Sequence, residues 1–241
     1  MTPCNHIETI RQLIDRMAQT KPDNAFLLSP ETGKVITFCT LQDQSRRLSA
    51  ELLRAGLKPG DKTAFLLDNG LYTAQLFLGV MYGGFVAVPL NVRAGVSQLS
   101  YTLDHCDARV VYVGKEYSAL LEEVMANVRR TVRVIPADVD DFSETAAGQI
   151  TSELIAPGPE DPALLIYTSG SVGQPKAAVH THRSVLAHGR NSVRSHQLSA
   201  SDRSLLVLPL HHINAECVTL VPTLLSGGSV IVPHRFSISQ F

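Results

Sequence analysis

The chain has 241 residues, of which 44% are hydrophobic and 18% are charged, with 21 basic and 22 acidic side chains. This composition is typical of a globular protein with a sizeable core. The formal charge is -1 and no block of like charges occurs, which disfavours nucleic acid or an anionic membrane as the main partner. The four cysteines are scattered without C-x-x-C spacing, so we interpret them as reduced structural thiols.

The N-terminus lacks the basic and then apolar order of a secretory signal, so export is not indicated and a cytoplasmic location is expected. The longest apolar run, residues 76–90, is interrupted by glycines and a proline, and it is shorter than the roughly 18 residues of a membrane span. We expect no membrane span. The run is interpreted as a buried helix followed by a buried strand.

Short apolar runs alternate with amphipathic segments along the first part of the chain. The runs at 25–28 and 34–38 flank a turn and predict a hairpin. Thr40 followed by Asp43 is a capping-box pattern that predicts the start of a helix, and Gly56 predicts its end. The later pattern predicts strands at 62–67, 85–89 and 109–113 and helices at 72–82, 96–105 and 116–128.

The second part follows residues 137–161, which are rich in Asp, Glu, Gly, Pro and Ser and predict a surface connection. Beyond it the pattern predicts strands at 163–167, 177–180, 204–208 and 229–232 and helices at 184–196 and 215–225. Residues 237–241 are typical of the first turn of another helix, which suggests a truncated chain.

Buried strands that alternate with helices predict an α/β fold with mostly parallel sheets flanked by helices. We predict a first α/β subdomain over residues 1–160 and the start of a second over 161–241.

The most informative segment follows the strand predicted at 163–167. Small and hydroxyl-bearing residues leave several backbone N–H groups free to turn toward one anion, and a lysine adds a mobile positive charge. The loop matches neither the Walker pattern nor G-x-G-x-x-G. Such composition also suits a flexible connection. The candidate phosphate-binding residues are Thr168, Ser169, Gly170, Ser171, Val172, Gly173, Gln174, Pro175 and Lys176.

A second motif, L-P-L-H-H-I-N-A, begins at Leu208 and contains His211 and His212. A histidine pair in isolation is more often a hydrogen-bonded structural feature than a catalytic one. Asp202 and Glu216 are acids near this motif, and we expect solvated or helix-capping roles for both.

Together these motifs resemble those of the adenylate-forming, or AMP-binding, superfamily, and in particular its acyl-CoA synthetase branch. The loop resembles the signature T-S-G-[ST]-T-G-x-P-K-G and departs from it at Val172 and Ala177. The second motif resembles the family's P-L-aromatic-H segment, with His212 at the histidine position and His211 in the aromatic slot. The resemblance covers essentially the whole chain. It implies the large N-terminal domain of such an enzyme, truncated before the later motifs and the C-terminal catalytic domain.

The resemblance implies that a carboxylic acid attacks ATP to form an acyl-adenylate and that the acyl group then passes to coenzyme A. ATP and Mg²⁺ would be the cofactors and coenzyme A the co-substrate. The loop at 168–176 would hold the β- and γ-phosphates, and His212 would be the catalytic residue that orients the carboxylate. His211 and Asn214 would line the acyl pocket, although helix capping is as reasonable for Asn214. No metal ligand is assignable within this chain.

Three other functions stay open. The first is an adenylation domain that loads an acyl carrier protein. The second is a truncated, non-catalytic module that binds a nucleotide, an acyl-adenylate or a protein partner, and the third is a structural domain that has lost its ligand. The departures at Val172 and Ala177 favour the last two. The sequence does not identify the acyl group.

Overall fold

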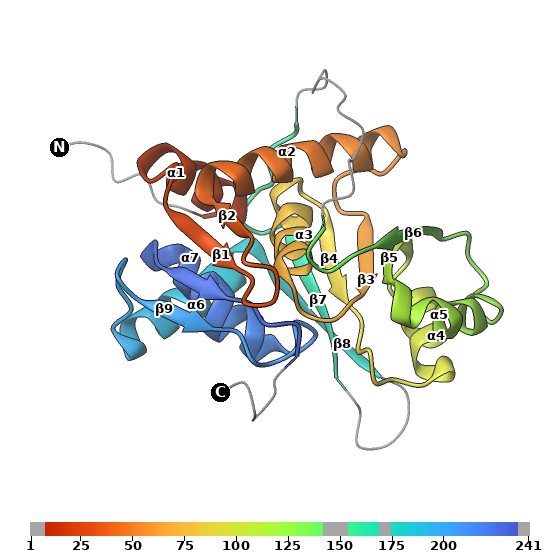
Figure 1. Cartoon of the computed structure of the whole chain (residues 1–241). Coiled ribbons are helices and arrows are strands. Elements are labelled where there is room, and N and C mark those ends of the chain that lie inside the picture. Colours follow the sequence, from red (N-terminus) through yellow and green to blue (C-terminus); the bar gives the residue numbers. More distant parts are fainter. Residues whose placement is uncertain (1–7, 142–153, 169–174, 236–241) are drawn as a thin grey trace.

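The computed structural model describes residues 8–141, 154–168 and 175–235. Two sheets form the frame of this part of the chain (Figure 1). The first has the strand order β2 (Val35–Thr37), β1 (Ala25–Leu28), β10 (Ser229–Ile231), β9 (Arg203–Leu205). The second has the order β6 (Arg133–Ala137), β5 (Ala108–Gly114), β3 (Lys62–Leu66), β4 (Val86–Pro89), β7 (Pro162–Thr168), β8 (Lys176–Thr181).

Most strand pairs in both sheets are parallel. The β1–β2 and β7–β8 pairs are antiparallel, and the other pairs between the described strands are parallel. This arrangement confirms the predicted fold class and the predicted hairpin at the start of the chain. The helices are α1 (Ile10–Thr20), α2 (Phe38–Arg54), α3 (Leu71–Tyr82), α4 (Val96–His105), η1 (Lys115–Tyr117), α5 (Ser118–Met125), α6 (His182–His196), η2 (Ala215–Leu220) and α7 (Val221–Ser226).

The start of α2 differs from the prediction. Thr37, in extended conformation at the end of β2, accepts a hydrogen bond from the Thr40 N–H, so Thr37 caps the helix and Thr40 lies inside its first turn. Two threonines three positions apart offer the same capping chemistry, and the strand that precedes Thr37 decides between them. The predicted end is confirmed, because Gly56 has φ 86° just beyond the helix.

Two elements were not predicted. Helix α1 begins with a capping box between Thr9 and Gln12 and buries the stripe that contains Leu13 and Met17. Strand β6 lies at the edge of its sheet, is mostly exposed and includes Pro136, so it lacks a buried apolar pattern. The predicted helix at 237–241 lies outside the described residues.

The six-stranded sheet is buried on both faces. Ala64 and Leu66 of β3 pack in the core cluster beneath α4 and α5, whereas Phe65 between them packs in the cluster on the opposite face. Figure 1 shows α4 and α5 on one side of this sheet, and α3 with the four-stranded sheet on the other. The cluster on the α3 side continues to Leu27 of β1 and Val230 of β10, so it joins the two sheets.

Both sheets draw strands from both sides of residue 160. Strands β7 and β8 complete the sheet formed by β3 to β6, whereas β9 and β10 join β1 and β2. The division into subdomains over 1–160 and 161–241 stays a prediction, and the hydrogen-bonded sheets themselves cross it.

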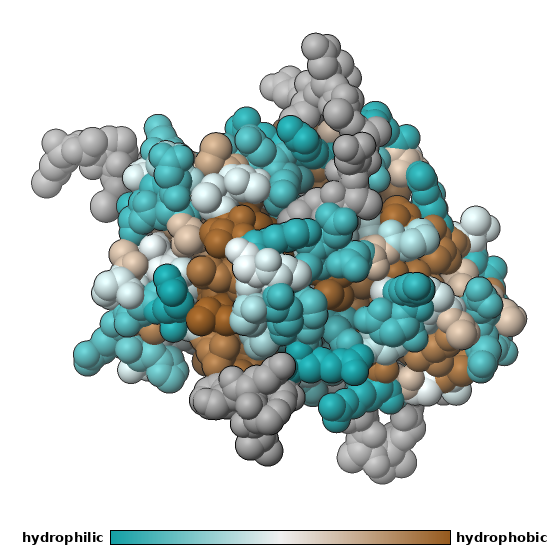
Figure 2. Space-filling view, in the orientation of Figure 1, coloured by the Kyte–Doolittle hydropathy of each residue, from teal (hydrophilic) through white to brown (hydrophobic). Residues whose placement is uncertain are grey.

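The outer surface is mixed in character. Figure 2 shows a mainly hydrophilic face with limited apolar areas between polar ones. Within the described ranges, no helix has the length and hydropathy to cross a membrane. Residues 76–90 form the buried end of α3 and strand β4, as predicted.

Three cysteines lie within the described residues. Cys39, Cys106 and Cys217 are free, and burial raises the pKa of the Cys106 and Cys217 thiols to about 12. Such thiols stay protonated and unreactive, which agrees with the interpretation of reduced structural cysteines. Cys4 lies outside the described residues.

Candidate functional site at the carboxyl ends of the strands

A cavity of about 430 Å³ lies where parallel strands of both sheets end. Its lining follows the carboxyl ends of β3, β4 and β5 in one sheet and of β9 and β10 in the other. In open α/β sheets this edge is where ligands bind, because loops of neighbouring strands leave a crevice between them. The polar lining residues are Asp68, Asn69, Arg93, Tyr117, His211, His234 and Arg235.

Asp68 is the acidic group of the cavity wall. Its carboxylate accepts a hydrogen bond from the Tyr117 hydroxyl at 2.8 Å and two from the Arg235 guanidinium at 2.9 and 2.6 Å. Burial, together with the neighbouring Asp68, raises the pKa of Tyr117 to about 12, so this hydroxyl remains a donor at neutral pH. Asp68 therefore ties β3, η1 and the segment after β10 together.

The histidine pair lies on a turn after β9. The His212 N–H donates to the Pro209 carbonyl and the Ala215 N–H donates to the His212 carbonyl. The two rings lie 4.5 Å apart between centroids. His211 lines the cavity, whereas His212 is exposed and lies outside the cavity lining.

The two histidines differ in electrostatic environment. Burial, then the neighbouring His212 and Arg93, lower the pKa of His211 to about 4. At neutral pH the His211 ring is therefore uncharged and offers one donor and one acceptor nitrogen. The proposed role of His211 in the wall of the acyl pocket and the assignment of His212 to the substrate both stay predictions.

The predicted phosphate loop leaves the same edge of the six-stranded sheet. Strand β7 runs parallel to β4, so Thr168 at its carboxyl end lies at the edge where β3, β4 and β5 also end. Thr168 pairs with Lys176 of β8, and its hydroxyl contacts the Lys176 carbonyl at 3.5 Å. Pro175 is buried and Lys176 is exposed. The other predicted loop residues, 169–174, lie outside the described residues.

One departure from the family signature has a structural explanation. Ala177 lies in β8, pairs with Tyr167 and packs its side chain against the cluster beneath α4 and α5. A methyl group is therefore accommodated where the signature has glycine. The other departure, Val172, lies outside the described residues.

The acids near the histidine motif differ from each other. Asp202 is exposed and accepts hydrogen bonds from the Ser199 N–H and hydroxyl, which agrees with the expected solvated, turn-capping role. Glu216 contradicts the same expectation, because it is 0% exposed and neither carboxyl oxygen has a hydrogen-bond partner among the described residues. Burial raises its pKa well above the ordinary value. The tertiary packing of η2 buries a side chain that its local sequence placed at a helix start.

Asn214 occupies the position before η2, yet its side chain makes no capping hydrogen bond. It is exposed and lies outside the cavity lining. Its proposed role in the acyl pocket therefore stays a prediction. Element η2 itself has π-helical geometry, which is rare and often occurs at functional sites.

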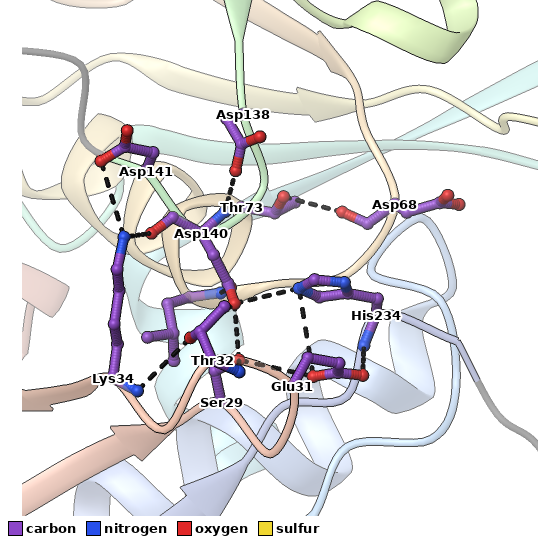
Figure 3. A network of polar contacts seen from close by, with 11 residues as sticks. Ser29, Glu31, Thr32, Lys34, Asp68, Thr73, Asp138, Asp140, Asp141 and His234 are labelled. Atoms are coloured by element: carbon purple, nitrogen blue, oxygen red, sulfur yellow. Dashed lines mark hydrogen bonds and ion pairs between the residues drawn. The ribbon is translucent and has the colours of Figure 1, made fainter.

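A polar junction beside the cavity joins four segments (Figure 3). It centres on Asp140, which is 3% exposed and accepts hydrogen bonds from the Ser29 hydroxyl at 2.5 Å, the Thr32 hydroxyl at 3.1 Å and the Leu71 N–H at 2.8 Å. The His234 ring nitrogen lies 3.0 Å from Asp140. Burial alone would raise the pKa of Asp140, but these donors outweigh it and lower the pKa.

The junction also contains the one group of possible metal ligands among the described residues. Ligand atoms of Glu31, Asp140 and His234 lie within 4.8 Å of one another. Asp140 already accepts three protein donors, and the Glu31 carboxylate accepts the backbone N–H of His234 at 2.8 Å. We interpret the group as a hydrogen-bonded junction between the two sheets. Sequence reasoning missed it because its members are far apart along the chain.

Comparisons with known proteins identify the family to which this chain belongs. Residues 14–240 match the family model described as AMP-binding enzyme, so the chain belongs to the AMP-binding enzyme family. It is 39% identical over 237 residues to a sulfoacetate–CoA ligase from Cupriavidus necator, with 97% of this chain and 47% of the relative covered. It is 33% identical to a feruloyl-CoA synthase from an Amycolatopsis species, with 85% and 40% covered.

The solved structures support the fold. The chain superposes on the inhibitor-bound N-terminal domain of FACL13 from Mycobacterium tuberculosis with a TM-score of 0.85 and 24% identity, covering 97% of this chain and 59% of that one. This likeness shows that the fold is that of the N-terminal domain of acyl-CoA ligases. The chain spans about half the length of the curated relatives that it matches.

Proposed function

We propose that this chain is the N-terminal part of an AMP-forming acyl-CoA synthetase, which activates a carboxylic acid with ATP and transfers the acyl group to coenzyme A. The observation that carries the proposal is that both motifs follow the carboxyl ends of strands at the side of the two sheets where the cavity lies. The predicted phosphate loop begins at Thr168 beside the other parallel strand ends, and the histidine motif leaves β9 at the cavity between the sheets. Family membership and relatives that are acyl-CoA ligases support it.

Each predicted residue receives a role in this reaction. The loop at 168–176 binds the β- and γ-phosphates of ATP, with Mg²⁺ as the accompanying ion. His212 orients the substrate carboxylate, while His211 and Asn214 form the pocket wall. The substrate itself supplies the nucleophile, so these residues act by positioning and by electrostatic stabilisation. We place the enzyme in the cytoplasm.

The test uses an extended enzyme in which this sequence is joined to the second half of the Cupriavidus necator ligase. We expect acid-dependent exchange of pyrophosphate into ATP. The acid panel contains sulfoacetate, ferulate and a long-chain fatty acid, which are named in curated relatives. An extended enzyme that folds, binds ATP and shows no exchange with any carboxylic acid would count against the proposal.

Variants of the histidine pair test the assigned roles. His212→Ala in the extended enzyme should slow acyl-adenylate formation about tenfold to a thousandfold, the range for loss of one preorganised polar contact. His211→Phe should be nearly silent, because it restores the aromatic residue of the family motif. Single-turnover rates measure both, and a larger loss for His211→Phe would reverse the assignment.

A carrier-protein acceptor is the alternative for the second step. After acyl-adenylate has formed, coenzyme A and a phosphopantetheinylated carrier protein are supplied separately and thioester formation is measured. Transfer to the carrier protein alone would replace the coenzyme A part of the proposal. Formation of no adenylate, together with tight nucleotide binding, would favour a non-catalytic binding module.

A further inference from the structure

The side chain of Asn69 connects the six-stranded sheet to the segment that carries the histidine pair. Asn69 follows β3 and is 6% exposed. Its amide nitrogen donates to the Leu208 carbonyl at 2.9 Å and to the Leu206 carbonyl at 3.4 Å, and its amide oxygen accepts the Leu210 N–H at 3.0 Å. One amide therefore satisfies three backbone groups of a segment more than a hundred residues away.

Leu206 and Leu210 of the segment are buried in the core cluster, but its backbone has few hydrogen bonds to other elements. Strand β9 ends at Leu205 and lies at the edge of its sheet, and the ladder to β10 ends with the Leu206 N–H. Across the described ranges 8–141, 154–168 and 175–235, the backbone of residues 207–210 is bonded by Asn69 and, within the turn itself, by the His212 N–H. The next two residues are His211 and His212. Loss of this side chain would therefore release the turn that presents both rings.

Asn69 is itself firmly held. Its neighbour Asp68 is bound by Tyr117 and Arg235, and the Asp68 carbonyl accepts the Thr73 hydroxyl at 2.7 Å. On the other side, a side chain at Gly70 would collide with the backbone of Val139, so the turn between β3 and α3 is closely packed. Because Asn69 is held rigidly, its hydrogen bonds fix the histidine turn after β9 relative to the end of β3 in the other sheet.

We propose that Asn69 is a positioning residue that holds the His211–His212 turn at the edge of the six-stranded sheet where the predicted phosphate loop also begins. It contacts no reacting atom and acts through the histidine turn. Its contribution to the reaction rests on the proposed function, whereas its hold on the turn is a property of this chain alone.

The first experiment uses the 241-residue chain and asks whether the turn loosens in Asn69→Ala. We expect the NMR-measured pKa of the His211 ring to rise from about 4 toward the ordinary histidine value, because an opened turn admits water. Hydrogen exchange of the Leu210 amide should become at least about tenfold faster, because its acceptor is gone. Asn69→Leu is the second variant. It nearly keeps the side-chain volume and adds no charge but loses all three bonds, so it should give the same two changes.

Ser100→Ala is the matched control. Ser100 is also 6% exposed, and its hydroxyl bonds to the Val96 and Val124 carbonyls on the far face of the same sheet. It should lower thermal stability without moving the His211 pKa or the Leu210 exchange rate. The inference is overturned if Asn69→Ala lowers the melting temperature as Ser100→Ala does but leaves the His211 pKa and the Leu210 exchange rate unchanged. If Asn69→Ala fails to fold, Asn69→Leu decides by the same two measurements.

The second experiment uses the extended enzyme. Asn69→Leu should lower the single-turnover rate of adenylation at least about tenfold while the Kd for ATP changes little, because Asn69 acts through the histidine turn that is assigned to the acyl substrate. An unchanged rate overturns the role in the reaction, even if the turn loosens. If the unmodified extended enzyme shows no adenylation, the proposed function fails, and the His211 pKa and Leu210 exchange still decide whether Asn69 holds the turn.

Discussion

Two buried carboxyl groups, Asp140 and Glu216, have opposite environments. Asp140 accepts hydrogen bonds from two hydroxyls and one backbone N–H and faces His234, whereas Glu216 has no partner for either oxygen among the described residues. The surroundings lower the pKa of Asp140 and raise that of Glu216. The comparison shows that burial alone does not decide what an acid contributes. The hydrogen-bond donors that other segments supply decide whether a buried acid stabilises the fold.

The largest expected effect is at Asp140. Asp140→Ala should lower the free energy of unfolding by about 3–5 kcal/mol, because it leaves several buried partners without their acceptor. Urea denaturation of the 241-residue chain measures this loss. A loss below about 1 kcal/mol, the usual value for one ordinary hydrogen bond, would contradict the view that Asp140 centres the junction.

The same residue makes a pH-dependent prediction. Because the folded-state pKa of Asp140 is lowered, its ionised form stabilises the protein above the unfolded-state pKa of about 3.9, and this contribution disappears as the pH falls through the folded-state value. The stability difference between the unmodified protein and Asp140→Asn should therefore be full at neutral pH and narrow in acid. Denaturant titrations across this pH range measure it, and a difference that widens in acid would contradict it.

Glu216 should respond in the opposite direction. Glu216→Leu should raise the free energy of unfolding by about 1–3 kcal/mol, since it removes a buried polar group without partners. Glu216→Gln separates charge from polarity. The folded-state pKa of Glu216 is raised, so the unmodified protein loses stability as the pH rises above about 4.3, and the advantage of Glu216→Gln should grow between pH 5 and pH 8. A destabilised Glu216→Leu would show that this carboxyl has a partner.

A smaller effect than at Asp140 is expected at Ser29, which donates one hydrogen bond to Asp140. Ser29→Ala should cost about 1.5–3 kcal/mol, the usual value for a hydrogen bond to a charged group. In a double-mutant cycle, most of this loss should vanish when Asp140 is already alanine. Additive losses would mean that Ser29 stabilises the turn independently of Asp140.

The smallest effect is expected at the adjacent acid, Asp141, which serves as the matched control. Its side chain is 68% exposed and lies 3.7 Å from Lys34. Asp141→Ala should change the free energy of unfolding by less than about 0.5 kcal/mol, because exposed ion pairs contribute little. A large loss of unfolding free energy, measured by urea denaturation, would mean that exposed charges contribute most of the stability of the junction.

The sequence by itself determined most of the helices and strands and the two chemical motifs of this protein. The apolar runs predicted most helices and strands, because burial on a sheet or helix imposes a period that a short window records. It also predicted the phosphate loop after β7 and the histidine pair after β9. Where it was wrong, as at Thr40, two residues offered the same local chemistry and the preceding strand selected Thr37.

Only the tertiary structure decided how distant side chains meet. The bonds from Asn69 to the histidine turn, the junction at Asp140 and the isolation of Glu216 each depend on segments far apart along the chain. The local sequence pattern does not predict such a contact. A single asparagine or acid has the same local pattern whether it lies in a solvated loop or in a buried junction. The physical reason is that hydrogen bonding and desolvation depend on which groups the packed sheets bring within about 3 Å of each other.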